Sequence, residues 1–118
     1  MPPSFLQMKM NEVTGRFLSS VEFVWDYVQF RFDGPCLTAY TSPEFRDANA
    51  LLTRKERGFC DSLCSQIGAR VENIRVNERE LIISFASSSA IAVSLRDDAY
   101  TGPEAISYLA ANGDIVVA

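Results

Sequence analysis

The residue types that most often carry out chemistry are sparse in this chain. The 118 residues include no histidine, which excludes Ser-His-Asp and Cys-His nucleophilic arrangements and imidazole metal ligands. Neither a Gly-x-Gly-x-x-Gly loop nor a Walker-type phosphate loop occurs, so nucleotide binding of either kind is unsupported. We therefore expect no catalytic residue and no cofactor.

The three cysteines could in principle hold a metal ion. Cys60 and Cys64 are four residues apart, so a helix would present both thiols on one side, and Cys36 would be a third ligand. However, no Cys-x-x-Cys motif occurs, and both helix cysteines fall on the same apolar stripe as Phe59 and Leu63. Free cysteine commonly behaves as a small buried hydrophobe. We predict buried structural cysteines and no metal site.

Carboxylates gather near the end of a predicted strand. Asp97 and Asp98 follow the strand directly, and Glu104 comes shortly afterwards. Such a group could bind a cation or act in acid–base catalysis. The simpler interpretation is a solvated turn followed by a helix cap. A carboxylate- or cation-dependent enzyme remains an alternative function on these residues.

The best candidate for a binding surface is the outward side of the first predicted hairpin. Tyrosine and arginine anchor many protein interfaces, because they combine a large contact area with hydrogen bonding. The predicted partner-binding residues are Tyr27, Gln29, Arg31, Thr38 and Tyr40, with Gln29 opposite Tyr40 and Arg31 opposite Thr38. The alternative is that these cross-strand pairs only stabilise a solvated sheet face.

The outward side of a second predicted hairpin carries no charge. It comprises Ile82, Ser84, Ala86, Ala90, Ala92 and Ser94. Small uncharged residues suit close packing, so we expect the helix predicted at residues 103–111 to cover this side. The alternative is a homodimer contact through Ile82, Ser84, Ala92 and Ser94.

Alternating apolar and polar residues predict the strands that position these side chains. The alternation runs through Val21, Phe23 and Trp25, and again from residue 28 to residue 32. A turn at Gly34 and Pro35 would pair Phe32 with Leu37 and Phe30 with Ala39. Further strands are predicted at residues 71–76, 81–85 and 90–95, with an edge strand at residues 115–117.

Two helices are predicted from their capping signals. The main helix, residues 53–67, begins with the capping box of Thr53 and Glu56, carries its apolar stripe as far as Ile67 and ends at Gly68. A short helix at residues 103–111 begins in the same way. Residues 1–15 are predicted to be a loose N-terminal lead-in.

These elements predict a single α+β domain over residues 1–118. Its centre would be a mainly antiparallel sheet, or a partly closed barrel, of six to seven strands around the 53–67 helix. Residues 28–39 resemble residues 81–93, and each segment has a strand before it and a helix after it. We interpret this as a degenerate β-β-β-α repeat.

Composition narrows the classes of partner. The chain is 47% hydrophobic, which is ordinary for a folded domain, and its net charge is −4. No basic stripe is present, so we expect no nucleic-acid binding, and a basic protein partner would suit the charge. No signal peptide and no membrane-spanning run is visible, and an odd number of cysteines favours the cytoplasm.

Three short motifs resemble those of a family of short bacterial proteins of uncharacterised function. They are residues 26–35 (DYVQFRFDGP), 37–41 (LTAYT) and 102–105 (GPEA). The resemblance implies a bacterial source and brings no catalytic residues with it. In size and acidity the chain is also similar to immunity proteins of bacterial toxin systems.

The preferred functional hypothesis is a non-catalytic, intracellular interaction protein that binds a partner protein, in an immunity-like version by occluding a basic toxin. A small-ligand-binding domain is the second hypothesis, with an apolar ligand between the sheet and the 53–67 helix. The enzyme based on Asp97, Asp98 and Glu104 is the third.

Overall fold

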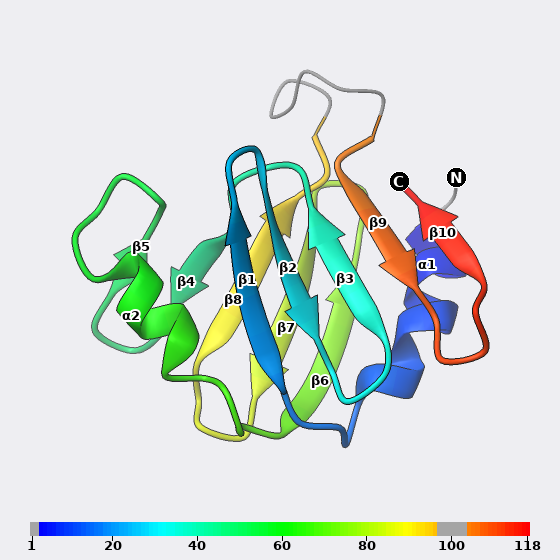
Figure 1. The fold of residues 1–118 in the computed structure, drawn as a ribbon, viewed down its shortest axis with the longest axis horizontal. Coiled ribbons are helices and arrows are strands. Elements are labelled where there is room, and N and C mark those ends of the chain that lie inside the picture. Colours follow the sequence, from blue (N-terminus) through cyan, green and yellow to red (C-terminus); the bar gives the residue numbers. More distant parts are fainter. Residues whose placement is uncertain (1–2, 97–103) are drawn as a thin grey trace.

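The fold is α+β, and its strands form two antiparallel sheets that lie face to face (Figure 1). It is seen in a computed structural model, which describes residues 3–96 and 104–118. Each sheet has five strands, and within the described residues neither closes into a barrel. The predicted α+β class and antiparallel pairing are confirmed. The prediction of one sheet or barrel of six to seven strands is only partly matched, because the strands are divided between two five-stranded sheets.

Sheet 1 has the strand order β1-β2-β3-β9-β10 and sheet 2 the order β5-β4-β8-β7-β6. The strands of sheet 1 are β1 (Ser20–Val24), β2 (Tyr27–Arg31), β3 (Cys36–Ala39), β9 (Ile106–Leu109) and β10 (Ile115–Val117). Those of sheet 2 are β4 (Glu44–Arg46), β5 (Leu51–Leu52), β6 (Val71–Val76), β7 (Glu80–Phe85) and β8 (Ala90–Ser94). The helices are α1 (Pro3–Met10), the 3₁₀ helix η1 (Asn11–Val13) and α2 (Phe59–Cys64).

The two halves of the chain have the same order of elements. Helix α1 is followed by the five strands β1 to β5, and helix α2 by the five strands β6 to β10. In each half the first three strands form one meander, while the last two cross over and join the other half's meander: β4 pairs with β8, and β9 pairs with β3. The predicted β-β-β-α unit is not seen within the described residues, because no helix follows β8; the order that recurs is a helix followed by five strands.

The core fills the space between the two sheets. Phe30, Leu37 and Tyr108 from sheet 1 meet Ile83 and Ile91 from sheet 2, and each of these side chains is fully buried. Phe32, just after β2, is also fully buried, so the predicted inward direction of Phe30 and Phe32 is confirmed. Strands β2, β7 and β9 alternate buried with more exposed side chains, as strands with one solvated face do, whereas all four residues of β3 are buried.

The main helix is shorter than predicted. Thr53 and Glu56 do form the expected contact, with the Thr53 backbone N–H donating to the carboxylate at 2.9 Å, but this contact closes a turn. Gly58 then has a φ of 91°, which is not helical, so α2 begins only at Phe59. None of the described helices is long and apolar enough to cross a membrane.

The predicted helix at residues 103–111 is wrong, because Ile106–Leu109 forms strand β9. Ile106 and Tyr108 are fully buried, whereas Ser107 and Leu109 point to the other side of sheet 1. This is a period of two, and pairing with both β3 and β10 satisfies the backbone. The capping signal that precedes this segment in the sequence led to the wrong prediction of a helix.

The predicted loose lead-in is instead an ordered helix. Leu6 and Met10 of α1 and Val13 of η1 are buried in the core at 1%, 0% and 0% exposure. Gln7 of α1 faces the edge of β6: its side-chain N–H donates to the Ile74 carbonyl at 2.8 Å, and its side-chain oxygen accepts from the Val76 N–H at 2.7 Å. The side-chain amide thus takes the place of a neighbouring strand.

The register of the first hairpin differs from the prediction by two residues. Phe30 lies opposite Leu37, and Val28 lies opposite Ala39. The Phe32 N–H donates to the Pro35 carbonyl at 2.8 Å, so Phe32 closes the turn rather than pairing with Leu37. Because the shift is even, every side chain keeps its predicted face.

Replacing Gln7 tests its role at the β6 edge. Gln7→Met keeps the length of the side chain but leaves the Ile74 carbonyl and the Val76 N–H without this partner, so we expect the free energy of unfolding to fall by about 1–2 kcal/mol. Met8→Ala, at the neighbouring position that is 62% exposed, is the control and should change it by less than about 0.5 kcal/mol. Urea denaturation measures both values, and equal effects of the two substitutions would contradict the role of Gln7.

Candidate functional site

The five predicted partner-binding residues all lie on the outer face of sheet 1, the side turned away from sheet 2. Gln29 is opposite Thr38, which is opposite Ser107 on β9. In the next row Arg31 is opposite Cys36, which is opposite Leu109, which is opposite Ile115 on β10. The predicted pairs of Gln29 with Tyr40 and of Arg31 with Thr38 are therefore wrong, although the shared face is as expected.

One end of this face is aromatic. The rings of Tyr27 and Tyr40 meet edge to face, with centroids 6.0 Å apart at an angle of 65°. Tyr40 is 40% exposed and Tyr27 is half-buried, so both rings are accessible from solvent. Trp25 does not continue β1 as the alternation predicts; it stands in the turn between β1 and β2 and is 92% exposed. Exposed tryptophan and tyrosine side chains are typical of interface anchors.

The middle of the face is a shallow hollow with a volume of about 240 Å³. The Gln29 side-chain N–H donates to the Thr38 hydroxyl at 3.1 Å across its floor. Thr38 and Cys36 are only 8% and 5% exposed, because longer neighbours stand over them. The residues that line the hollow are Gln29, Arg31, Cys36, Thr38, Ser107, Leu109 and Ile115.

Apolar side chains form the other end of the face. Leu109 is 40% exposed, Ile115 is 69% exposed and Val117 is 40% exposed. Arg31, which is also exposed, lies in the same row as Leu109 and Ile115. Sequence reasoning missed Leu109, because it assigned residues 103–111 to a helix, although the alternation of Ile106 and Tyr108 with Ser107 and Leu109 indicates a strand. It predicted the strand at residues 115–117 but did not place Ile115 and Val117 on this face.

Burial determines the chemistry of the thiol on the floor of the hollow. Burial raises the pKa of Cys36, and the positive charge of Arg31 opposes this effect only in part. A protonated thiol is a poor nucleophile and a poor metal ligand. The Cys36 thiol therefore contributes to packing rather than to covalent chemistry at neutral pH.

The predicted apolar stripe of the main helix is only partly correct. Phe59 and Leu63 are buried as expected, but Cys60 and Cys64 are exposed, and Ile67 is 46% exposed. The short helix turns just one side toward the core, and the two cysteines lie outside that side.

Within residues 3–96 and 104–118, no group of three cysteine or acidic side chains is placed to hold a metal ion. Asp97 and Asp98 lie outside the described residues, and Glu104 is half-buried at their border.

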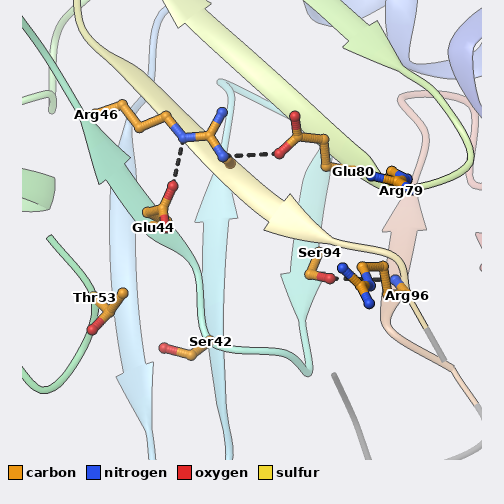
Figure 2. A pocket seen from close by; sticks show the side chains of 9 residues that line it. Ser42, Glu44, Arg46, Thr53, Arg79, Glu80, Ser94 and Arg96 are labelled. Atoms are coloured by element: carbon orange, nitrogen blue, oxygen red, sulfur yellow. Dashed lines mark hydrogen bonds and ion pairs between the residues drawn. The ribbon is translucent and has the colours of Figure 1, made fainter. Parts of the chain in front are cut away.

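The outer face of sheet 2 is occupied by an ion-pair network. Figure 2 shows Arg46 of β4 extending across β8, with its Nε atom 2.5 Å from Glu44 and its Nη2 atom 2.9 Å from Glu80 of β7. The hydrogen bond to Glu44, followed by that to Glu80, raises the pKa of Arg46. Ala92 lies in the strand that Arg46 crosses and is only 3% exposed. A hollow of about 300 Å³ borders this network.

This network accounts for Ala92, one of the small uncharged residues of the second hairpin. The register places Ala92 between Glu44 and Ile82, and a longer side chain there would obstruct Arg46. The segment 103–111, which was expected to cover these residues, contributes β9 to sheet 1 instead. A homodimer contact through Ile82, Ser84, Ala92 and Ser94 stays an untested prediction.

Comparison with known proteins does not assign the chain to a class beyond its α+β fold. No family model matches it, and neither a curated protein nor a solved structure is significantly similar to it. The resemblance of the three motifs to short bacterial proteins therefore stays a prediction, and the function has to be inferred from the surfaces themselves.

The three thiols should react at two distinct rates. Cys60 and Cys64 are exposed, whereas Cys36 is buried and has a raised pKa. With an aromatic disulfide reagent near pH 8, we expect two thiols to react quickly and Cys36 at least about tenfold more slowly. Cys36→Ser should remove only the slow phase, and Cys60→Ser with Cys64→Ser only the fast one. A Cys36 that reacts in the fast phase would contradict the assigned burial.

Proposed function

We propose that this chain is a non-catalytic interaction protein that binds a partner protein through the outer face of sheet 1. The observation that supports this most directly is the composition of the face. Three aromatic residues, one exposed arginine and three exposed apolar residues gather on one sheet surface or at its rim. Aromatic residues and arginine are enriched at the centres of protein interfaces, while lysine and acidic residues are depleted there.

The contrast with the other sheet strengthens the proposal. On sheet 2 three of the charged groups around β8 bond to one another, since Arg46 bridges Glu44 and Glu80. On sheet 1 the rings of Tyr27 and Tyr40 contact each other but remain accessible, and Ile115 has most of its side chain in water. Exposed apolar and aromatic area gains the most from being covered by a partner.

The charge of the chain favours a basic partner. The net charge is −4, but the strands that form the outer face of sheet 1 carry only Glu22 and Arg31 on it. Electrostatic attraction would therefore come from the rest of the surface and would speed encounter, while the aromatic and apolar residues would supply the affinity. Occlusion of a basic toxin, as in an immunity protein, is the specific form of this proposal. A cytoplasmic location fits the three free thiols.

The two other hypotheses have less support. An apolar ligand between the sheet and the main helix would need space that the fully buried side chains of the core occupy. An enzyme based on acidic residues would depend on Asp97 and Asp98, whose positions lie outside the described residues. No further observation on the described part of the chain favours either one.

Removal of the two tyrosine rings tests the proposal. We expect Tyr27→Ala with Tyr40→Ala to weaken partner binding at least about a hundredfold, since interface aromatic residues commonly contribute 2 kcal/mol or more each. Arg31→Ala should weaken binding to a smaller extent. Arg75→Ala is the matched control, because Arg75 is an exposed arginine on a strand of sheet 2.

The measurement is affinity capture from cells that naturally make the chain, followed by titration of the protein that is captured. A partner that binds the wild type and Arg75→Ala but not the tyrosine double variant is the expected result. A partner that the double variant retains with full affinity, or the absence of any captured partner, would contradict the proposal.

A further inference from the structure

The edges of the two sheets differ in how their backbone groups are satisfied. An edge strand presents unpaired N–H and C=O groups, to which another strand can bind. The edge of β6 is covered by α1, where Gln7 bonds to Ile74 and Val76. The edge of β1 lies beside α2: Phe23 packs against Phe59, with ring centroids 6.5 Å apart, and Arg54 donates to the Val24 carbonyl at 3.2 Å. Each helix thus covers the first strand of the other half of the chain.

The last strands of the two halves, β5 and β10, form the remaining edges. Strand β5 has only two residues, Leu51 and Leu52, so it offers little to a partner. Strand β10 is longer, and its residues are Ile115, Val116 and Val117. It contains no lysine, proline or acidic residue of the kind that natural edge strands use to prevent pairing.

The hydrogen bonds of β9 and β10 determine which backbone groups are free. Ala118 and Ile106 exchange two bonds, of 3.2 and 3.1 Å, and the Ala110 N–H donates to the Asp114 carbonyl at 2.8 Å. In an antiparallel ladder such bonded positions alternate, so Val116 bonds to β9 while Ile115 and Val117 direct their N–H and C=O groups away from the sheet. No residue in the described part of the chain pairs with these outward groups.

We propose that β10 pairs with β10 of a second copy of this chain, antiparallel and about a two-fold axis. Ile115 of each copy would lie opposite Val117 of the other copy. Only this register places both outward residues of one strand opposite the outward residues of the other, so that four backbone hydrogen bonds form. Shifting it by two residues leaves a single bonded pair within β10.

The side chains suit a second copy. Ile115 and Val117, which are 69% and 40% exposed, would contact each other across the pair and be shielded from water. Asp114 would lie opposite Ala118 of the other copy, not opposite a second carboxylate. Its charge is already matched by Lys9, whose Nζ atom is 2.9 Å away. Like charges therefore do not meet along the pair.

The contact is short, so the dimer should be weak. Three residues from each copy cannot bury the 1,200–2,000 Å² that is typical of stable complexes, and we expect a dissociation constant on the order of 10–100 µM. Pairing would join two five-stranded sheets into one continuous sheet and place two outer faces of sheet 1 side by side. It does not rest on the proposed function: Ile115 and Val117 belong to the same outer face, but neither tyrosine takes part in the pairing.

Sedimentation velocity over concentrations from about 5 to 500 µM is the first test. The wild type should change from monomer to dimer over this range. Val117→Pro removes one outward N–H but no bond within the sheet, and it should weaken dimerisation at least about tenfold. Val117→Thr has nearly the same shape and keeps the N–H, so it is the control and should still dimerise. A wild type that stays monomeric at the highest concentration, or a Val117→Pro that dimerises as the wild type does, would refute the pairing.

Disulfide cross-linking tests the register without using proline. Ile115→Cys and Val117→Cys are made separately, each with Cys60→Ser and Cys64→Ser to remove the exposed thiols. A mixture of the two variants should form a disulfide-linked heterodimer at least about tenfold faster than either variant links to itself, because only the mixed positions face each other. Equal rates for the mixture and for the single variants would overturn the proposed register.

Discussion

The exchange of two hairpins between the halves of the chain is the constraint on which the rest of the structure depends. Strands β9 and β10 follow the second meander but pair with β3 of the first, and β4 and β5 follow the first meander but pair with β8 of the second. Neither sheet is complete without the other half. The apolar core between the sheets therefore forms from both halves at once, which ties the packing to a set of long-range strand pairings.

The same exchange creates two outer faces of different character. On sheet 2 it brings Arg46 over Ala92 and within reach of Glu80, so that a positive charge is balanced by side chains of the chain itself. On sheet 1 it brings Leu109 and Ile115 into the same row as Arg31, and their apolar area stays in contact with water. The charges over β8 are balanced within the chain, whereas the apolar area on sheet 1 gains stability when it is covered. This difference, more than any single residue, supports a binding role for sheet 1.

The sequence predicted much of the candidate site but only part of the fold. The period of two assigned Tyr27, Gln29 and Arg31 to one face correctly, because that face survives a register error of two residues. It failed for Trp25, since a tight turn between β1 and β2 interrupts the alternation there. It also failed at residues 106–109, where a capping signal in the preceding segment outweighed a run of only four alternating residues. Short strands carry too little periodicity to override a strong local signal.

The sequence by itself determined which chemistry is absent and which residues turn inward. Without histidine there is no imidazole catalysis, and the inward direction of Phe30 and Ile83 follows from alternation alone. Only the tertiary structure decided which strands that are distant in the sequence are neighbours, because β3 meets β9 across more than half of the chain and no local pattern records that contact. Composition could not reveal that α1 and α2 cover two sheet edges while β10 is left open. Edge protection is a property of the assembled backbone, since it depends on which hydrogen-bonding groups remain unpaired once the strands have met.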